Sequence, residues 1–217
     1  MKRLLFCSVL LVVCVTVFAQ IDVSAGAHAG YLYADFTYKY KEDADNYLVF
    51  SQVDNVLGFG AFVDATYVRL NAEYAMSLNA TQKTVLCVAG SKSESSADSP
   101  DGYSMHLLNV FLLGKYPIAL GPVTIWPTAG ALYSMLLSWD NNGDGVDDDL
   151  STVARNDVYV VAGCGIDFPI TQQIFLTGSA LFNWDLMPVD EKGYDPAPEE
   201  TYTQWFITAR VGVGFRF

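Results

Sequence analysis

Apolar and polar side chains alternate along residues 206–217. In an extended strand, one face of this segment carries only apolar side chains, which are Ile207, Ala209, Val211, Val213, Phe215 and Phe217. In a helix, Arg210 and Arg216 would lie on nearly opposite sides and interrupt any apolar stripe. The period of two therefore predicts a β-strand, and an apolar strand face that ends in an aromatic residue is typical of a strand that crosses a membrane.

The same alternation recurs in seven earlier segments, which we also predict to be strands. They cover about residues 22–37, 56–63, 67–85, 103–115, 123–137, 157–168 and 173–185, and the last strand covers about 202–217. Closure of such a set leaves no strand edge in lipid, and bacterial single-chain barrels have an even number of strands. The pattern therefore predicts an all-β fold, an eight-stranded antiparallel up-and-down transmembrane β-barrel.

The connections between these segments are of two kinds. Three are short and nearly uncharged, over residues 64–66, 117–122 and 169–172. Four are long and polar, over 39–55, 89–102, 138–156 and 187–201, and they hold 17 of the 24 acidic residues. Outer-membrane barrels have short periplasmic turns and longer extracellular loops. We therefore expect the acidic loops outside the cell, whereas a soluble β-sandwich would have no physical reason to sort its loops in this way.

The N-terminal residues 1–19 have the features of an export signal. A basic pair precedes an apolar run over 4–18, and small or aliphatic residues end it. This run is shorter than the roughly twenty residues that a membrane-spanning helix needs. We expect a cleaved signal peptide and one barrel domain over 20–217. The alternatives are a retained anchor and lipidation at Cys14, although Val13 stands where a smaller residue is expected.

The composition agrees with a barrel and excludes some functions. Hydrophobic residues make up 52% of the chain and charged residues 17%, and no second apolar run is long enough for a spanning helix. Loss of Lys2 and Arg3 with the signal takes the formal charge from −12 to −14. A nucleic-acid partner is disfavoured because phosphate binding needs a basic surface. Only Cys87 and Cys164 remain in the mature chain, and we expect free thiols.

The inward faces of the predicted strands combine small, bulky and charged residues. Glycines alternate there with three large side chains, Phe62, Trp126 and Phe175. An eight-stranded barrel is just wide enough for side chains to fill. Charges enclosed in it must be paired, and we expect Glu73 and Arg210 to belong to an ion-pair network. The interior is either plugged by these groups or forms a gated polar channel.

The third long loop contains a pattern of oxygen-bearing residues that is typical of calcium loops. The candidate ligands are Asp140, Asn142, Asp144, Val146 through its carbonyl group, and Asp148. Gly145 permits the sharp turn that such a loop needs. Ser151 stands where an acidic residue normally completes the shell, so we expect weak Ca²⁺ binding. The alternative is a solvated acidic loop with no cofactor.

Two further sets of residues suggest positions near the membrane surfaces. Aromatic girdles at both interfaces fix the depth of a barrel. We expect an outer girdle of Tyr31, Tyr33, Tyr103, Tyr133, Trp139, Trp184 and Trp205, and an inner girdle of Tyr67, Tyr116, Phe168, Phe215 and Phe217. Ser104 and His106 share a face near the outer rim, where a catalytic dyad is geometrically conceivable. No further catalytic pattern accompanies them, so we do not expect an enzyme.

The export signal, the eight alternating segments and the ending RVGVGFRF resemble the small outer-membrane β-barrels of the OmpA-transmembrane, OmpX and OmpW type. The stretch LLGKYPIALGPVTIWP, residues 112–127, also resembles the strand–turn–strand units of spirochaete outer-membrane barrel proteins. The resemblance implies an integral protein of a Gram-negative or spirochaete outer membrane. Its partners would be outer-membrane lipid and the assembly machinery, for which Phe217 would be the signal.

From this resemblance we expect a structural or surface-interaction role, with contact to an extracellular partner through the acidic loops. The first alternative is a narrow channel or transport pathway for small or apolar molecules, as in OmpW-like barrels. The second alternative is a lipid-modifying enzyme at the membrane rim.

Overall fold

The computed structural model describes residues 22–41, 45–98, 103–140, 145–146, 156–186 and 200–217. The predicted signal peptide lies outside these residues. In chain order the strands are β1 (Val23–Lys41), β2 (Tyr47–Ala65), β3 (Val68–Val88), β4 (Ser91–Asp98), β5 (Ser104–Lys115), β6 (Ile118–Leu120), β7 (Val123–Asp140), β8 (Asn156–Pro169), β9 (Ile174–Asp185) and β10 (Glu200–Arg216). Within the described part of the chain, no helix is long and apolar enough to cross a membrane.

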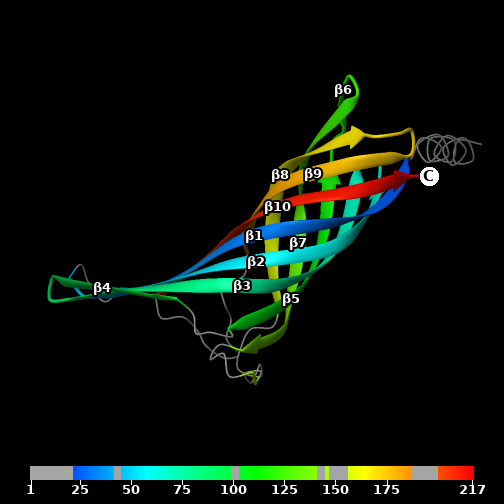
Figure 1. Cartoon of the computed structure of the whole chain (residues 1–217). Coiled ribbons are helices and arrows are strands. Elements are labelled where there is room, and N and C mark those ends of the chain that lie inside the picture. Colours follow the sequence, from blue (N-terminus) through cyan, green and yellow to red (C-terminus); the bar gives the residue numbers. More distant parts are fainter. Residues whose placement is uncertain (1–21, 42–44, 99–102, 141–144, 147–155, 187–199) are drawn as a thin grey trace, which may run out of the picture.

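Eight strands form a closed ring. Each pairs antiparallel with two neighbours, in the order β1, β2, β3, β5, β7, β8, β9, β10 and back to β1. The other two strands lie outside the ring, since β4 pairs with β3 and β6 with β7. Figure 1 shows β4 projecting from one end of the barrel, while β6 and the C-terminus lie at the other end. The predicted eight-stranded antiparallel barrel is confirmed.

The period-two pattern separates the two faces of the wall. On β10, Thr208 and Arg210 are buried in the interior, whereas Ile207, Val211 and Val213 are exposed on the outside. The other ring strands follow the same rule. The exposed apolar side chains between the two ends include Phe59, Val63, Leu70, Leu112, Val160, Ile166 and Leu176. Such a surface is stable when lipid, not water, surrounds it.

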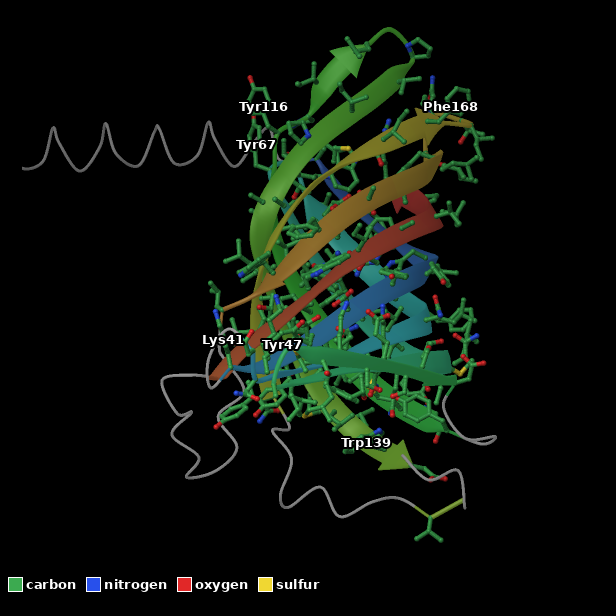
Figure 2. The ribbon with its side chains drawn as sticks, turned by 90° about the vertical axis from the view of Figure 1, so that its left-hand side faces the viewer. Lys41, Tyr47, Tyr67, Tyr116, Trp139 and Phe168 are labelled. Carbon is green, nitrogen blue, oxygen red and sulfur yellow. The ribbon has the colours of Figure 1, made fainter. Side chains whose placement is uncertain are left out.

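Aromatic side chains border this apolar belt at both ends. Tyr67, Tyr116 and Phe168 are each half or more exposed and lie at the same end of the barrel, with Phe168 on a different side from the two tyrosines (Figure 2). At the level of the other border, the exposed aromatic residues are Tyr31, Tyr33, Tyr74, Tyr133, Phe182 and Trp184. The end with Tyr67 and Tyr116 also holds the short turns and the C-terminus. Because outer-membrane barrels have their short turns on the periplasmic side, we call it the periplasmic end and the opposite end the outer end.

The predicted boundaries were wrong where strands leave the membrane. The segment 56–63 was too short, because β2 begins at Tyr47 and pairs with β1 as far as Lys41. Most of the expected loop 39–55 is therefore strand. In this outer part, residues 47–53 are all half-buried and do not alternate between exposed and buried, so the signal used for the prediction disappears.

Two expected connections contain extra strands. The loop predicted over 89–102 includes β4, whose residues are all exposed and mostly polar. The turn predicted over 117–122 includes β6, which forms a hairpin with β7 through Gly121 and Pro122. Gly121 has a φ of 63°, a value that glycine adopts without the steric cost that other residues meet.

Two bulges change which residues face inward near the outer end. Asn55 pairs with Asn79 and Val56 with Ser77, so Leu78 is an extra residue in β3. In the same way, the pairing of β5 with β7 shifts between His106 and Leu107, which leaves Leu137 extra in β7. An inserted residue moves the following side chains to the opposite face. Beyond each bulge, the inward positions therefore differ from those that simple alternation predicts.

Candidate functional site

The periplasmic half of the interior is filled by a charged cluster around Asp64. Arg69 donates to it from Nε to Oδ1 and from Nη2 to Oδ2, both at 2.6 Å. Lys115 Nζ lies 2.9 Å from Oδ2. The Arg69 guanidinium lies over the rings of Phe62 and Trp126, at 4.3 and 4.4 Å from their centroids. Asp64 and Arg69 are directly opposite each other across the β2–β3 turn, and the sequence pattern did not identify this pair.

A second cluster lies around Glu73 near the middle of the barrel. The structure brings Glu73 and Arg210, suggested from the sequence as an ion pair, to 2.8 Å between Oε2 and Nε. His28 Nε2 lies 3.1 Å from the same oxygen, and Asn109 Nδ2 donates to Oε1 at 3.4 Å. The Arg210 guanidinium lies 4.0 Å from the centroid of the Phe111 ring. Glu73 is fully buried, so these contacts replace its hydration.

Little space remains between the two clusters. The cavity that both Arg69 and Arg210 line has a volume of about 10 Å³, which is room for no more than a single water molecule. Phe62, Trp126 and Phe175, predicted to face inward, are all buried there. In the described part of the chain, this half of the barrel is a packed core.

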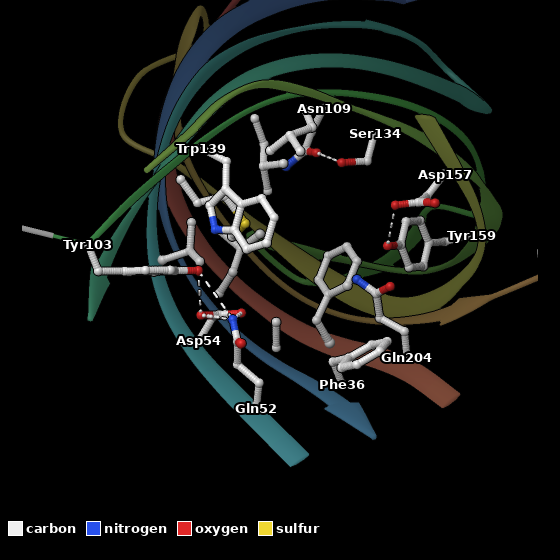
Figure 3. A pocket seen from close by; sticks show the side chains of 17 residues that line it. Phe36, Gln52, Asp54, Tyr103, Asn109, Ser134, Trp139, Asp157, Tyr159 and Gln204 are labelled. Atoms are coloured by element: carbon white, nitrogen blue, oxygen red, sulfur yellow. Dashed lines mark hydrogen bonds between the residues drawn. The ribbon is translucent and has the colours of Figure 1, made fainter. Parts of the chain in front are cut away.

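A cavity of about 350 Å³ occupies the opposite half of the interior. Aliphatic side chains from four ring strands (β1, β2, β5 and β7) form much of its wall, namely Leu32, Ala34, Val56, Met105, Leu107 and Leu136. Figure 3 shows Asp54, Gln52, Tyr103 and Trp139 on one side, with Asp157, Tyr159 and Gln204 across from them. Several of these residues lie beyond the aromatic border of the belt, so the cavity belongs to the outer end of the barrel.

Polar groups in the cavity form two hydrogen-bonded sets. Gln52 Nε2 donates to both carboxylate oxygens of Asp54 at 3.1 Å, and the Tyr103 hydroxyl donates to Oδ1 at 3.1 Å. On the other side, the Tyr159 hydroxyl donates to Asp157 Oδ2 at 3.4 Å. These contacts fix two carboxylates in a wall that is otherwise mostly aromatic and aliphatic.

Asn109 and Ser134 form the floor of this cavity. The Ser134 hydroxyl donates to Asn109 Oδ1 at 2.7 Å, and Asn109 in turn contacts Glu73. The floor is therefore continuous with the Glu73 cluster beneath it. The sequence did not identify this site, because its residues come from strand ends that hydrophobic periodicity does not align.

Two residues expected in the outer aromatic girdle line the cavity instead. Tyr103 is buried, with its hydroxyl on Asp54, and Trp139 points into the same space. Trp139 follows the bulge at Leu137, which turns it inward. Tyr103 directly precedes β5, where its direction does not follow from strand alternation. The girdle prediction was wrong for these two residues.

Only part of the predicted calcium loop belongs to the described residues. Asn142, Asp144 and Asp148 lie outside them. Asp140 is buried at the end of β7, where its Oδ2 accepts a hydrogen bond from the Gly145 amide at 2.7 Å, and Val146 is exposed. Within the described ranges, no group of three or more His, Cys, Asp or Glu side chains is arranged to hold a metal ion. Calcium binding stays a prediction.

The suggested Ser104–His106 dyad has a different arrangement. His106 Nδ1 forms a hydrogen bond of 2.6 Å with the Tyr74 hydroxyl, and the two rings stack at 5.8 Å between centroids. Among the described residues, Tyr74 and not Ser104 is the hydrogen-bond partner of this imidazole. The pair lies at the outer border of the belt, which is a typical position for interfacial aromatic residues.

Beyond the barrel wall, the outer parts of β1, β2 and β3 continue into a sheet with β4 (Figure 1). Lys92 Nζ on β4 lies 2.5 Å from Glu94 Oε1, and Lys83 of β3 lies 3.6 Å from the other oxygen. The hydrogen bond from Lys92 lowers the pKa of Glu94 below its ordinary value. This part of the chain is exposed and polar.

The remaining predicted residues lie on the outer surface or near it. Phe217 is exposed. Its amide donates to the Val23 carbonyl at 3.1 Å, which joins the end of β10 to the start of β1. Its role as an assembly signal stays a prediction. Cys87 and Cys164 are free thiols, the first buried and the second exposed on the belt.

No protein-family model matches the chain. No curated protein matches it either. Among solved structures, the chain is similar to the outer-membrane protease OmpT from Escherichia coli, with a TM-score of 0.50 and 9% identity over 90% of this chain and 97% of that one. The fold is that of an outer-membrane β-barrel. At this identity the similarity concerns the fold and not the activity.

Two other outer-membrane or surface proteins are similar at TM-scores just below 0.5. Neisserial surface protein A has a TM-score of 0.49 and 13% identity, over 89% of this chain and 99% of that one. The outer membrane protein OprG from Pseudomonas aeruginosa has a TM-score of 0.48 and 9% identity, over 91% and 96%. An apolar belt between two aromatic girdles on such a barrel is the lipid-facing surface of an outer-membrane protein.

Proposed function

We propose that this protein is a non-conducting surface protein of the outer membrane. Its barrel holds the chain in the lipid, and its outer sheet contacts molecules outside the cell. The observation that carries the proposal is the filled periplasmic half of the interior, where the Asp64 and Glu73 clusters leave about 10 Å³.

An ion pathway would have to pass both clusters. The side chains of Asp64 and Arg69 are almost completely buried, as are those of Glu73 and Arg210. Separating a buried ion pair leaves charges that neither water nor a partner compensates, which costs about 3–5 kcal/mol for a single truncation. A gate made of two such clusters would open rarely, and this favours a plug over the gated channel.

The outer sheet supports a surface role. The residues of β4 are all exposed and include two charged side chains that pair with each other, Lys92 and Glu94. A polar sheet that extends beyond the lipid adds nothing to anchoring in the membrane. It does present a large solvent-exposed surface to an extracellular partner, as we expected of the long connections at this end.

Conductance in planar bilayers tests the first half of the proposal. The purified protein should give no steady openings, while a general porin in the same bilayers provides the positive control. Steady openings of constant size would contradict the plug. They would favour the narrow pathway that is the main alternative, with the outer cavity as its entrance.

Accessibility on intact cells tests the second half. A short epitope inserted between Ala89 and Gly90, at the β3–β4 turn, should bind its antibody on whole cells. The matched insertion between Gly121 and Pro122, at the β6–β7 turn, should bind only after the outer membrane is permeabilised. The two turns lie at opposite ends of the barrel (Figure 1), so the reverse result would invert the proposed orientation.

A further inference from the structure

The outer cavity contains negative charge without a compensating cation. Its lining includes Asp54 and Asp157 but no lysine, arginine or histidine. Among the described residues, no basic side chain forms an ion pair with either carboxylate, whereas Glu73 and Asp64 deeper in the barrel are each paired with an arginine. The cation beneath the floor, Arg210, is bound to Glu73. The cavity is therefore an electronegative space.

Aromatic rings surround the same space. Phe36, Trp139 and Tyr159 line it together with Tyr103 and Phe206. The two carboxylates lie on opposite sides (Figure 3), and the rings fill the wall between them. Ring faces attract cations through their quadrupole, and the attraction increases where water is excluded. The carboxylates and the aromatic faces thus both favour a positively charged ligand.

We propose that this cavity binds a small organic ammonium ion with an apolar body. The ammonium group would donate to Asp54 or Asp157 and lie against an aromatic face, while the apolar body contacts the aliphatic wall near Leu32. A volume of about 350 Å³ falls within the range of about 300–1,000 Å³ that is typical of small-molecule sites.

Other classes of ligand fit the lining less well. A calcium or magnesium ion requires six or more oxygen ligands or retained waters. The two carboxylates of this cavity lie on opposite sides (Figure 3), and within the described residues no three His, Cys, Asp or Glu side chains are grouped to hold a metal ion. An anion would be repelled by both carboxylates. A neutral apolar compound would displace water from two ionised groups without replacing its hydrogen bonds, which carries a large cost.

The inference goes beyond the proposed function. A surface protein with a plugged interior needs no ligand in its cavity, and a ligand can bind in a cavity that is closed at its floor. The conductance result and the ligand-binding result are therefore independent of each other.

Calorimetric titration of the protein in lipid nanodiscs tests the proposal with three probes of similar size. They are 2-phenylethylammonium, the neutral 2-phenylethanol and the anionic 3-phenylpropionate. We expect saturable binding of the ammonium compound, at least about tenfold weaker binding of the alcohol because the charge-assisted hydrogen bond is lost, and none of the anion. The proposal is wrong if the alcohol or the anion binds as tightly, or if the ammonium compound does not saturate by about 10 mM.

Variants then locate the bound cation. Asp54→Asn combined with Asp157→Asn should weaken ammonium binding by about tenfold or more and leave binding of the alcohol unchanged. The two single variants show which carboxylate contacts the ammonium group. The matched control is Glu94→Gln, which removes one negative charge from the exposed sheet and should leave both affinities unchanged. Equal weakening by the control, or no weakening by the paired cavity variants, would overturn the assignment. If the cavity variants fail to fold, the comparison of the three probes on the unaltered protein still decides.

Discussion

Glu73 on β3 and Arg210 on β10 meet across the lumen, with Oε2 and Nε 2.8 Å apart, although the two residues are 137 positions apart in sequence. Space for the pair comes from glycines on β1 and β2. A Cβ at Gly58 would lie 2.8 Å from the Glu73 carboxyl carbon, and one at Gly30 would lie 2.9 Å from Arg210 Cγ. The narrow lumen can therefore hold two long charged side chains, because the residues beside them on β1 and β2, Gly30 and Gly58, have no side chain.

Arg210→Met should strongly destabilise the barrel. The substitution leaves the buried Glu73 carboxylate with His28 and Asn109 as its remaining partners, and removal of one member of a buried ion pair costs about 3–5 kcal/mol. The measurement is the free energy of unfolding by urea in lipid vesicles.

Two further variants make this measurement specific. Glu73→Gln combined with Arg210→Met should be less destabilising than Arg210→Met alone, because no uncompensated charge remains. Lys92→Met removes the cation of the exposed Lys92–Glu94 pair and should cause no measurable change. A stability of Arg210→Met equal to that of the unaltered protein would show that the pair does not stabilise the fold.

Gly165→Ala should destabilise the periplasmic half of the interior. A Cβ at Gly165 would lie 2.0 Å from Cζ2 of Trp126, so the buried indole ring would have to move. Overpacking of a filled core costs about 1–3 kcal/mol. The matched control is Gly114→Ala, where the nearest atom to the new Cβ is 3.5 Å away. Thermal unfolding, followed by gel mobility in detergent, should show a loss only for the first variant.

The environments of Trp139 and Trp184 can be compared with lipid-soluble quenchers. In variants that retain a single tryptophan, brominated acyl chains should quench Trp184, which is 49% exposed on the belt. Trp139 should be protected because its ring lies inside the cavity. Quenching of Trp139 to the same extent would place it in the girdle, as simple alternation predicts, and would contradict the inward turn after Leu137.

Calcium binding by residues 140–148 remains open to a direct test. The sequence pattern predicts a dissociation constant of about 10⁻⁴–10⁻³ M, because the twelfth position of the loop is Ser151 and not an acidic residue. Calcium should raise the unfolding temperature of the protein, and Asp144→Asn should reduce this effect. No shift up to about 10 mM Ca²⁺ would remove the prediction and leave a solvated acidic loop.

The strand count and the two faces of the wall were predictable because they depend on local chain geometry. Successive side chains of a strand point to opposite faces whatever its neighbours are, so Val211 and Val213 were assigned outward and Thr208 inward without knowledge of any pairing. Alternation marks a strand only where its two faces meet different surroundings. At β4 both faces meet water, and no apolar pattern marks the strand.

The cavity could not be derived in this way. Its carboxylates, Asp54 and Asp157, come from strands that are not neighbours in the ring, and their separation depends on the stagger of all the strands between them. The inserted residues Leu78 and Leu137 also exchange the inward and outward positions in the parts of β3 and β7 that follow them. Hydrophobic periodicity does not identify a bulge, since the extra residue is itself apolar in both cases.

By itself, the sequence determined that the chain forms a barrel wall, because burial in lipid imposes a period of two on each strand separately. It also placed Glu73 and Arg210 on the inward faces, where enclosed charges must be paired. Only the tertiary structure decided that Arg69 pairs with Asp64 and Arg210 with Glu73, and that the outer half of the lumen stays open. These relations depend on register around the closed ring, where residues distant in sequence are brought together by hydrogen bonds between strands.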